Sequence, residues 1–141
     1  MKACVVDASL VAAAFFQEPH AESARAVLAA DRPLCAPDLI SAEFGNVVWK
    51  RHRRREITEE EAAQLMADFL RLPLHITPTG ELADVALQLA MRTGRTVYDC
   101  LYLALAVRTR SVLVTADKRL VNALAGTPLA KYLTGLDAQP R

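Results

Sequence analysis

The sequence has little of what a disulfide-linked, zinc-binding or membrane-spanning protein needs. Its cysteines, Cys4, Cys35 and Cys100, are odd in number, far apart and without zinc-type spacing, which argues against a disulfide framework. No apolar run approaches the roughly 20 residues of a membrane helix, and Asp7 interrupts any signal-peptide core. We expect a soluble, cytoplasmic protein, without membrane contact, whose cysteines pack in its interior.

Glycine and net charge are also scarce. Five glycines and a hydrophobic fraction of 52% favour an ordered, helix-rich globule over a disordered chain. Lys and Arg number 17 against 16 Asp and Glu, a formal net charge of +1, so only a local cluster can indicate a nucleic-acid binder. No linker, repeat or low-complexity segment divides the chain, and its length suits one compact domain over residues 1–141.

Short apolar runs alternate with helical patterns along the chain. Strands are expected over residues 2–6, 34–36, 74–76 and 111–115. Helices are expected over residues 9–16, 20–30, 38–54, 58–70, 79–93, 96–108 and 118–124, with a short tail beyond. Asp38 is a candidate N-cap of the third helix, and Thr58 with Glu61 forms a capping box for the fourth. This alternation predicts an α/β sandwich with a mainly parallel sheet.

Two acids directly follow apolar strand candidates. Asp7 ends the first strand, and Asp117 follows the segment SVLVT at residues 111–115. Ligands of open parallel sheets bind outside the carboxyl ends of the strands, so both acids can face one crevice. Each can instead cap the helix that follows it, and this structural interpretation stays open.

Two further acids lie in helices that we expect to be buried. Glu43 is on the apolar stripe of the helix at 38–54, four residues after Leu39. A carboxylate there is costly unless it is paired, protonated or bound to a cation. An ion pair with an arginine such as Arg25 is the structural alternative. Asp99 is in the first turn of the most apolar helix, where the helix dipole also favours negative charge.

The four acids together indicate a metal site more strongly than any one alone. Ionised carboxylates in one crevice repel each other and raise each other's pKa values. A hard divalent cation relieves this repulsion, and Mg²⁺ prefers oxygen ligands. Zinc fits less well, because no His or Cys cluster is near. Such a site suits phosphodiester hydrolysis, since a metal polarises the phosphate and lowers the pKa of an attacking water.

The segments VVDAS, PDLISAEFGNVVW, TVYDCLYLALA and LVTADKRL resemble the PIN-domain family, specifically the small VapC-type toxins of toxin–antitoxin pairs. The resemblance covers essentially the whole chain. It implies a three-layer α/β/α sandwich and an endoribonuclease that depends on Mg²⁺ or Mn²⁺. It also implies an RNA substrate, a cognate antitoxin protein and a homodimer or higher assembly.

The resemblance assigns roles to individual residues. The catalytic and metal-binding acids would be Asp7, Glu43, Asp99 and Asp117. Ser9 and Thr115 match the hydroxyl residues that accompany the first and last acids of the family, and would orient the carboxylates or a water.

One dense basic run follows Glu43 on the same expected helix. It contains Lys50, Arg51, Arg53, Arg54 and Arg55, with His52 between them. The run is a candidate RNA-phosphate contact, although cations at a helix end also complement the helix dipole. By contrast, Trp49 and Tyr102 are at helical spacing with apolar neighbours, so we expect both to pack rather than stack on bases.

Three other functions compete with the ribonuclease toxin. One is a housekeeping PIN nuclease that acts in RNA processing. Another is a receiver-like phosphoacceptor domain, which needs paired acids after its first strand, where Asp7 stands alone. The third is a non-catalytic PIN scaffold, which the presence of all four acids argues against.

Overall fold

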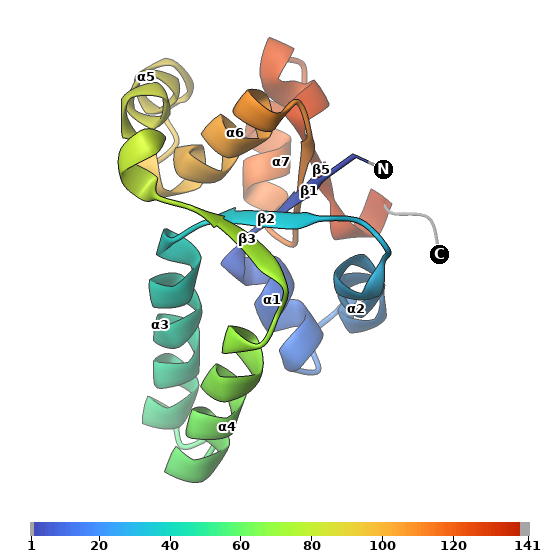
Figure 1. Cartoon of the computed structure of the whole chain (residues 1–141), viewed down its shortest axis with the longest axis vertical. Coiled ribbons are helices and arrows are strands. Elements are labelled where there is room, and N and C mark those ends of the chain that lie inside the picture. Colours follow the sequence, from blue (N-terminus) through green and yellow to red (C-terminus); the bar gives the residue numbers. More distant parts are fainter. Residues whose placement is uncertain (1, 139–141) are drawn as a thin grey trace.

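The computed structural model describes residues 2–138, and its centre is a five-stranded parallel sheet (Figure 1). The strands are β1 (Cys4–Val6), β2 (Leu34–Pro37), β3 (Leu74–Thr77), β4 (Val112–Thr115) and β5 (Leu133–Gly135). Their order is β3-β2-β1-β4-β5, and every pairing is parallel. The chain therefore builds outward from β1 to β3 and then reverses to β4. Such a reversal point is where open parallel sheets bind ligands.

Helices cover both faces of the sheet. Below it in Figure 1 are α1 (Ala8–Phe15), α2 (Ala21–Ala29), α3 (Leu39–Arg53) and α4 (Glu59–Leu70). Above it are α5 (Ala83–Thr93), α6 (Val97–Thr109) and α7 (Lys118–Leu124). Right-handed crossovers that run outward in opposite directions place their helices on opposite faces. The predicted three-layer α/β/α sandwich with a parallel sheet is confirmed.

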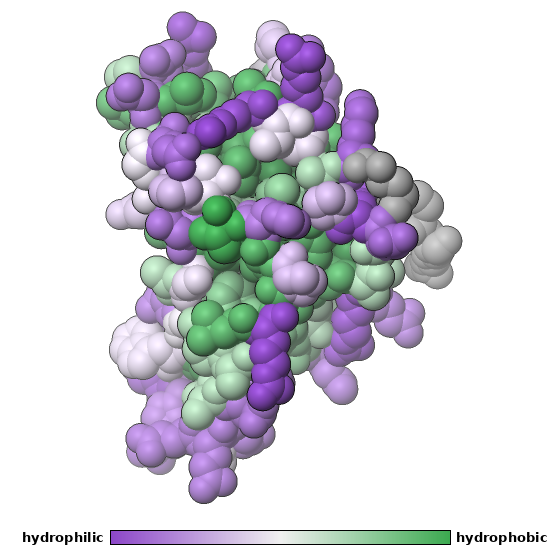
Figure 2. All heavy atoms as spheres, in the orientation of Figure 1, coloured by the Kyte–Doolittle hydropathy of each residue, from purple (hydrophilic) through white to green (hydrophobic). Residues whose placement is uncertain are grey.

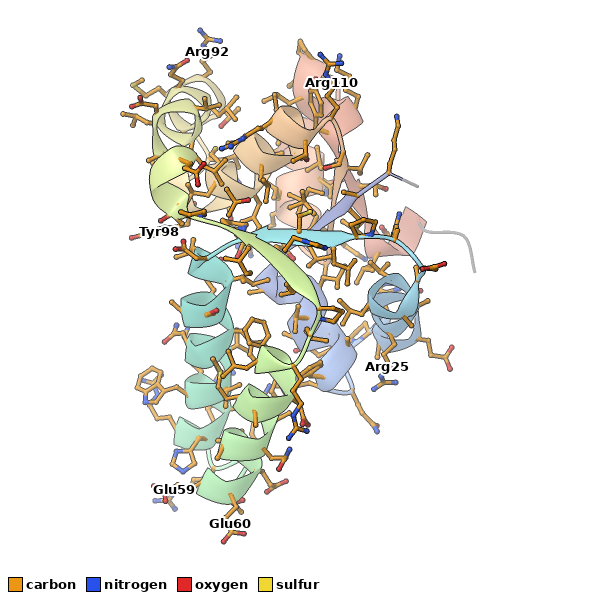
Figure 3. The ribbon with its side chains drawn as sticks, viewed as in Figure 1. Arg25, Glu59, Glu60, Arg92, Tyr98 and Arg110 are labelled. Carbon is orange, nitrogen blue, oxygen red and sulfur yellow. The ribbon has the colours of Figure 1, made fainter. Side chains whose placement is uncertain are left out.

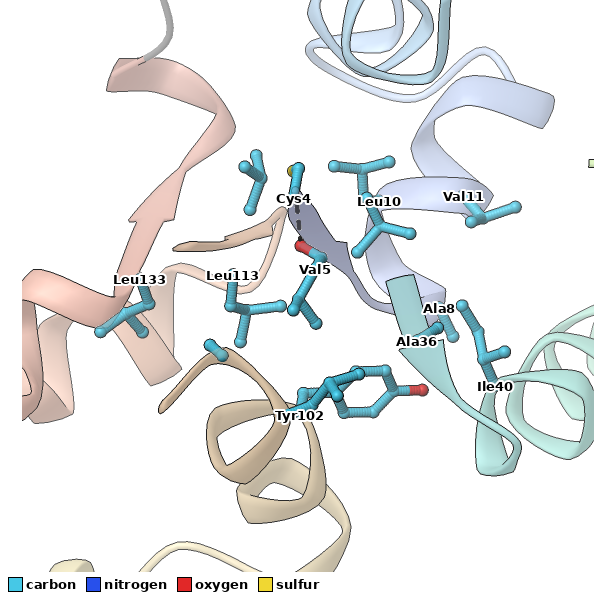
Figure 4. Close-up of a cluster of buried hydrophobic side chains, with 14 of the residues drawn as sticks. Cys4, Val5, Ala8, Leu10, Val11, Ala36, Ile40, Tyr102, Leu113 and Leu133 are labelled. Atoms are coloured by element: carbon cyan, nitrogen blue, oxygen red, sulfur yellow. Dashed lines mark hydrogen bonds between the residues drawn. The ribbon is translucent and has the colours of Figure 1, made fainter. Parts of the chain in front are cut away.

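The core fixes α6 tightly against the sheet. Residues 100–106 of this helix are all buried, because apolar side chains surround nearly its whole first three turns. Figure 4 shows Val5 of β1 and Leu113 of β4 between α6 and the helices of the other face. Each fully buried large apolar side chain stabilises the fold by about 1.5–3 kcal/mol. A helix held this firmly keeps its first turn, which contains Asp99, in a fixed place.

An aromatic cluster fixes α3 on the other face. Phe44 of α3 stacks on Phe69 of α4 with ring centroids 4.6 Å apart, and it meets Phe15 of α1 edge-on at 5.4 Å. Offset and edge-to-face pairs add about 0.5–1.5 kcal/mol beyond the area that they bury. Because Glu43 directly precedes Phe44, this cluster also determines where its carboxylate can reach.

Two local predictions were wrong. Asp38 does not cap α3: its backbone is helical, and its Oδ1 accepts the Thr79 N–H at 3.0 Å, which ties α3 to the turn after β3. That turn is a 3₁₀ helix (Thr79–Glu81), so α5 begins only at Ala83. The tail beyond α7, to which the sequence analysis assigned no structure, forms a 3₁₀ helix (Pro128–Tyr132), β5 and a final 3₁₀ helix (Leu136–Ala138).

Other local predictions agree with the structure. The capping box is formed, with Glu61 N–H donating to Thr58 Oγ1 at 3.1 Å and Thr58 N–H to Glu61 Oε1 at 3.0 Å. Cys4 and Cys100 are buried as predicted, whereas Cys35 is only half-buried, and all three are free thiols. Within residues 2–138, none of the helices has the length and apolarity to cross a membrane.

Candidate active site

Asp7 lies at the carboxyl end of β1 and serves as the N-cap of α1. Only 8% of its surface is exposed, and both carboxylate oxygens accept hydrogen bonds. Oδ1 accepts from Ser9 Oγ at 2.7 Å and from the Leu10 N–H at 3.0 Å, and Oδ2 accepts from Thr115 Oγ1 at 2.5 Å. Burial raises the pKa of Asp7, the hydroxyl donors oppose that shift, and the charge of Asp117 adds to it. The carboxylate is thus pre-oriented by the fold.

The hydroxyls of Ser9 and Thr115 join the ends of β1 and β4. Besides contacting Asp7, the two hydroxyl oxygens lie 3.2 Å apart. Ser9 Oγ accepts the Ala116 N–H at 3.1 Å, and Thr115 Oγ1 accepts the Asp117 N–H at 3.0 Å. The network fixes the chain at the point where the strand order reverses. Both hydroxyls donate to Asp7, and the role in the site predicted for Ser9 and Thr115 stays a prediction.

Asp117 caps α7 and also faces the cleft. Its Oδ1 accepts the backbone N–H groups of Arg119 and Leu120 at 3.0 and 3.2 Å. The structural interpretation raised for Asp7 and Asp117 therefore holds for both, because each caps the helix after it. Capping a helix does not exclude a role in the site, since the side chains of Asp7 and Asp117 also line one cleft.

Glu43 projects from the buried side of α3 and meets Tyr102 of α6. The Tyr102 hydroxyl donates to Glu43 Oε1 at 2.5 Å. The alternative ion pair with Arg25 is not formed, because Arg25 Nε donates to the Ala14 carbonyl and its side chain extends outward from α2 (Figure 3). Burial raises the pKa of Glu43, the Tyr102 donor lowers it, and the charges of Asp7 and Asp99 raise it further.

Asp99 lies in the first turn of α6 and is half-buried. Its backbone N–H donates to Thr96 Oγ1, the N-cap, at 3.1 Å. Burial raises the pKa of Asp99, and the charge of Asp117 raises it further, while Arg95 lowers it. The helix dipole would favour a charged Asp99, whereas the charge of Asp117 disfavours it. The dipole alone therefore does not describe the electrostatic environment of this carboxylate.

All four predicted acids line one cleft of about 300 Å³. Its full lining is Asp7, Ala8, Ser9, Glu43, Asn46, Val47, Lys50, Asp99, Tyr102, Asp117 and Leu120. They come from four separate parts of the chain, and the fold brings them together beside the reversal point between β1 and β4. Lys50 is the cationic side chain of this lining. The cleft therefore gathers negative charge that the described side chains leave largely uncompensated.

The donor chemistry of this cleft fits a hard divalent cation, because every acid offers carboxylate oxygens and the charge of a neighbouring acid raises the pKa of Asp7, of Glu43 and of Asp99. Across residues 2–138, however, no three His, Cys, Asp or Glu side chains are arranged to hold one ion as they stand. The hydrogen bonds to Asp7 and Glu43 restrain their present orientation. Each carboxylate oxygen has two acceptor positions, so these bonds leave capacity for a further ligand.

The predicted basic run divides into groups with different contacts. Arg51 is built into the fold: its guanidinium bonds Glu18 at 2.6 Å and Glu56 at 3.5 Å and lies 4.0 Å from the centroid of the Phe16 ring. Lys50 lines the acidic cleft. Arg53, Arg54 and Arg55 are exposed. A phosphate-contacting role therefore suits these three and Lys50, and not Arg51.

The sequence interpretation was wrong about Trp49 and incomplete for Tyr102. Trp49 is 51% exposed, so it is not a core residue. Tyr102 is buried among apolar side chains as expected (Figure 4), but its hydroxyl bonds Glu43 and its side chain also lines the cleft. A spacing signal was present: Tyr102 is three residues after Asp99, and Asn46 is three after Glu43, which places each on the same helix face as its acid.

Comparison with known proteins relates the chain to a family and to solved structures. A family model described as "PIN domain" matches residues 4–125. Ribonuclease VapC3 from Pyrobaculum aerophilum is 34% identical over 118 residues, which cover 82% of this chain and 90% of that protein. The solved structure of PAE2754, also from Pyrobaculum aerophilum, has a TM-score of 0.70 at 24% identity, covering 96% of this chain and 85% of the other.

A chain of a toxin–antitoxin complex from Klebsiella pneumoniae has the same fold. Its TM-score is 0.64 at 17% identity, and the match covers 94% of this chain and 97% of that chain. At such identities the solved structures establish the fold, whereas the family model and VapC3 establish kinship in sequence.

Proposed function

Because the chain belongs to the PIN domain family, we propose that it is a VapC-type endoribonuclease that depends on a divalent metal and acts as the toxin of a toxin–antitoxin pair. The observation that supports this most is the shared cleft of Asp7, Glu43, Asp99 and Asp117 at the reversal point of the sheet. The relative VapC3 is itself named a ribonuclease.

In this proposal the four carboxylates hold Mg²⁺ or Mn²⁺. Such an ion, when bound, polarises a phosphodiester and lowers the pKa of a nearby water. The rest of the chemistry falls to the chain. Ser9 and Thr115 fix the carboxylate of Asp7, and Tyr102 fixes that of Glu43. Restrained carboxylates reorganise little during the reaction, which is how polar sites favour a charged transition state.

Basic residues next to the cleft bind the RNA backbone in this proposal. Lys50 lines the cleft, and Arg53, Arg54 and Arg55 continue along α3 and just past its end. Cations of this kind contribute affinity without selecting a sequence. Arg51, although part of the predicted patch, is left out because Glu18 and Glu56 already bind it.

A cognate antitoxin is the proposed protein partner. The support is the likeness to a chain of a toxin–antitoxin complex, together with the relationship to VapC3. A homodimer or higher assembly and a cytoplasmic location stay predictions.

Family membership removes the receiver-like alternative. A housekeeping PIN nuclease would use the same cleft, and a neighbouring short reading frame encoding a DNA-binding antitoxin would decide against it. A non-catalytic scaffold would lack activity on any RNA.

The test is incubation of purified, antitoxin-free protein with total cellular RNA, in Mg²⁺ or in chelator, followed by mapping of the cut ends. We expect discrete cuts in Mg²⁺ alone, and Asp99→Asn should reduce their rate at least ~10²-fold. Equal cutting by the parent and this variant would show that the assigned site is wrong. Absence of cutting in Mg²⁺ and in Mn²⁺ would support the scaffold.

A further inference from the structure

Trp49 and Arg53 form an exposed cation–π pair on α3. The guanidinium of Arg53 lies 4.7 Å from the centroid of the Trp49 ring, one helical turn earlier in the chain. Trp49 is the single tryptophan of the sequence, and about half of its surface remains exposed. Two flat groups in contact, one aromatic and one cationic, make a surface on which a third flat group can stack.

This pair follows directly from the acidic cleft along the same helix. Glu43 and Lys50 line the cleft, and Trp49 is the residue before Lys50. At 1.5 Å per residue, the ten residues from Glu43 to Arg53 span about 15 Å along the helix axis. An RNA strand with one phosphate in the cleft would therefore reach the pair within a few nucleotides, passing Lys50.

A hollow of about 620 Å³ lies beside the pair, at the end of α3. It is lined by Trp49, His52, Arg53, Arg55, Glu56, Ile57, Thr58 and Glu61. Its two acids are engaged elsewhere: Glu56 pairs with Arg51 at 3.5 Å, and Glu61 accepts the Thr58 N–H. Arg53 and Arg55 have no acidic partner among the described ion pairs, so these two cations and the exposed indole are available to a ligand, and the volume suits a single nucleotide.

The cations around this hollow lack acidic partners. Among the ion pairs of residues 2–138, none involves Arg53, Arg54 or Arg55, whereas Arg51 makes two. Hydrophilic side chains cover the end of the α3–α4 hairpin in Figure 2. Unpaired cations beside an aromatic surface are the combination with which proteins bind single-stranded nucleic acid.

We propose that the Trp49–Arg53 pair is a base-stacking platform for one unpaired nucleotide of the RNA, a few nucleotides from the phosphate in the cleft. The inference rests on the proposed ribonuclease function and adds a contact to a base, where the basic run supplies contacts to phosphates. The base must be unpaired, because the faces of paired bases are covered by their neighbours in a helix. The platform thus favours RNA loops and single strands.

The single tryptophan makes the contact directly measurable. The protein is titrated in chelator, so that no cutting occurs, with a fluorescently labelled oligouridylate and with a labelled RNA duplex. Anisotropy of the label reports binding, and tryptophan fluorescence reports stacking. We expect the single strand to quench Trp49 in parallel with the anisotropy change, and the duplex to bind without comparable quenching. Single-strand binding without quenching would overturn the proposal.

Substitutions separate stacking from charge. Trp49→Leu should weaken single-strand binding about 10-fold, and Trp49→Phe should restore most of it, because a base stacks on either ring. The salt dependence of binding should be the same in Trp49→Leu as in the parent, since no cation is lost. Arg92→Gln, on exposed α5, is the charge control and should bind like the parent. Thermal melts confirm that each variant is folded.

The outcomes distinguish this inference from the function on which it rests. If the parent cuts RNA and Trp49→Leu binds and cuts like the parent, the platform is wrong while the ribonuclease stands, and the pair is free to contact a protein partner instead. If the parent neither binds nor cuts RNA in Mg²⁺, both fail together.

Discussion

The hydroxyl of Tyr102 donates a 2.5 Å hydrogen bond to Oε1 of Glu43 and so joins α6 to α3 across the acidic cleft. Burial, with the charge and hydrogen bond of Glu43 next, raises the pKa of Tyr102 far above its ordinary value. The phenol therefore stays protonated, and remains a donor, at neutral pH. We interpret Tyr102 as a positioning residue for Glu43.

Tyr102→Phe removes this hydroxyl and keeps the ring. Without its donor the pKa of Glu43 should rise further, because burial and the neighbouring acids then act unopposed. We expect a smaller rise in Tm on addition of Mg²⁺, and RNA cutting about 10-fold slower. Tyr98→Phe is the matched control, since Tyr98 is 61% exposed and outside the cleft lining. Equal Mg²⁺ shifts in the parent and Tyr102→Phe would contradict the positioning role.

Thr115→Val tests the network that joins β1 to β4. The change keeps the branched shape but leaves Asp7 Oδ2 without its donor and the Asp117 N–H without its acceptor. Unsatisfied buried partners cost about 1–3 kcal/mol, so the free energy of unfolding in urea should fall by that amount. Thr115→Ser, which keeps the hydroxyl, should recover both stability and cutting. Equal losses in the two variants would show that the methyl group, rather than the hydroxyl, matters.

Asp99→Asn should stabilise the metal-free protein at neutral pH. Burial and Asp117 raise the pKa of Asp99 in the folded state, so the unfolded chain ionises first as pH rises. Stability is therefore greatest below the ordinary carboxyl pKa and falls as pH rises through the folded-state value. The amide removes this loss, and a few degrees of Tm is the shift expected for about 1 kcal/mol in a domain of this size.

The measurement compares thermal melts of parent and Asp99→Asn in chelator at pH 4 and pH 7. The variant's advantage should be present at pH 7 and shrink at pH 4, because the raised pKa of Asp99 leaves less charge on the folded protein at the lower pH. Added Mg²⁺ should raise the parent's Tm more than the variant's. A variant that is less stable at both values, with equal Mg²⁺ shifts, would make Asp99 a structural residue of α6 only.

The basic run should separate into structural and RNA-binding members. Arg51→Gln removes the contacts to Glu18, Glu56 and Phe16, so it should lower Tm and leave the salt dependence of RNA binding unchanged. The double change of Arg54 and Arg55 to Gln should leave Tm unchanged and flatten the salt dependence by roughly 0.7 in slope per lost phosphate contact. If the double change leaves the salt dependence of RNA binding unaltered, Arg54 and Arg55 are only solvated helix-end residues.

The parts of the site that the sequence predicts are those with local signals. Asp7 and Asp117 each follow an apolar strand, and the carboxyl ends of parallel strands lie at the same edge of the sheet. Glu43 and Asp99 are conspicuous because charge on a buried helix face is costly. The fold class follows from the same alternation of strands and helices.

What the sequence did not predict depends on partners far away in the chain. Asp38 resembles an N-cap locally, but Thr79, 41 residues later, takes its carboxylate. In the sequence Arg51 resembles its exposed neighbours, because its partner Glu18 lies 33 residues earlier and only the fold brings the two together. β5 has three residues, one of them glycine, and exists through its pairing with β4. Helical spacing likewise could not determine which side of α3 packs against other elements, and so it wrongly predicted that Trp49 is a packed residue.

The most direct test of the account is calorimetric titration of Mn²⁺, in the absence of RNA, into the parent and into Asp7→Asn, Glu43→Gln, Asp99→Asn and Asp117→Asn. Mn²⁺ is chosen because carboxylate sites suit it, and Glu60→Gln, at the far end of the α3–α4 hairpin (Figure 3), is the control. The account predicts saturable binding to the parent and the control, weakened at least ~10-fold in each of the four variants. Absence of Mn²⁺ binding to the folded parent, or variants that bind as tightly as the control, would contradict a shared metal site in this cleft.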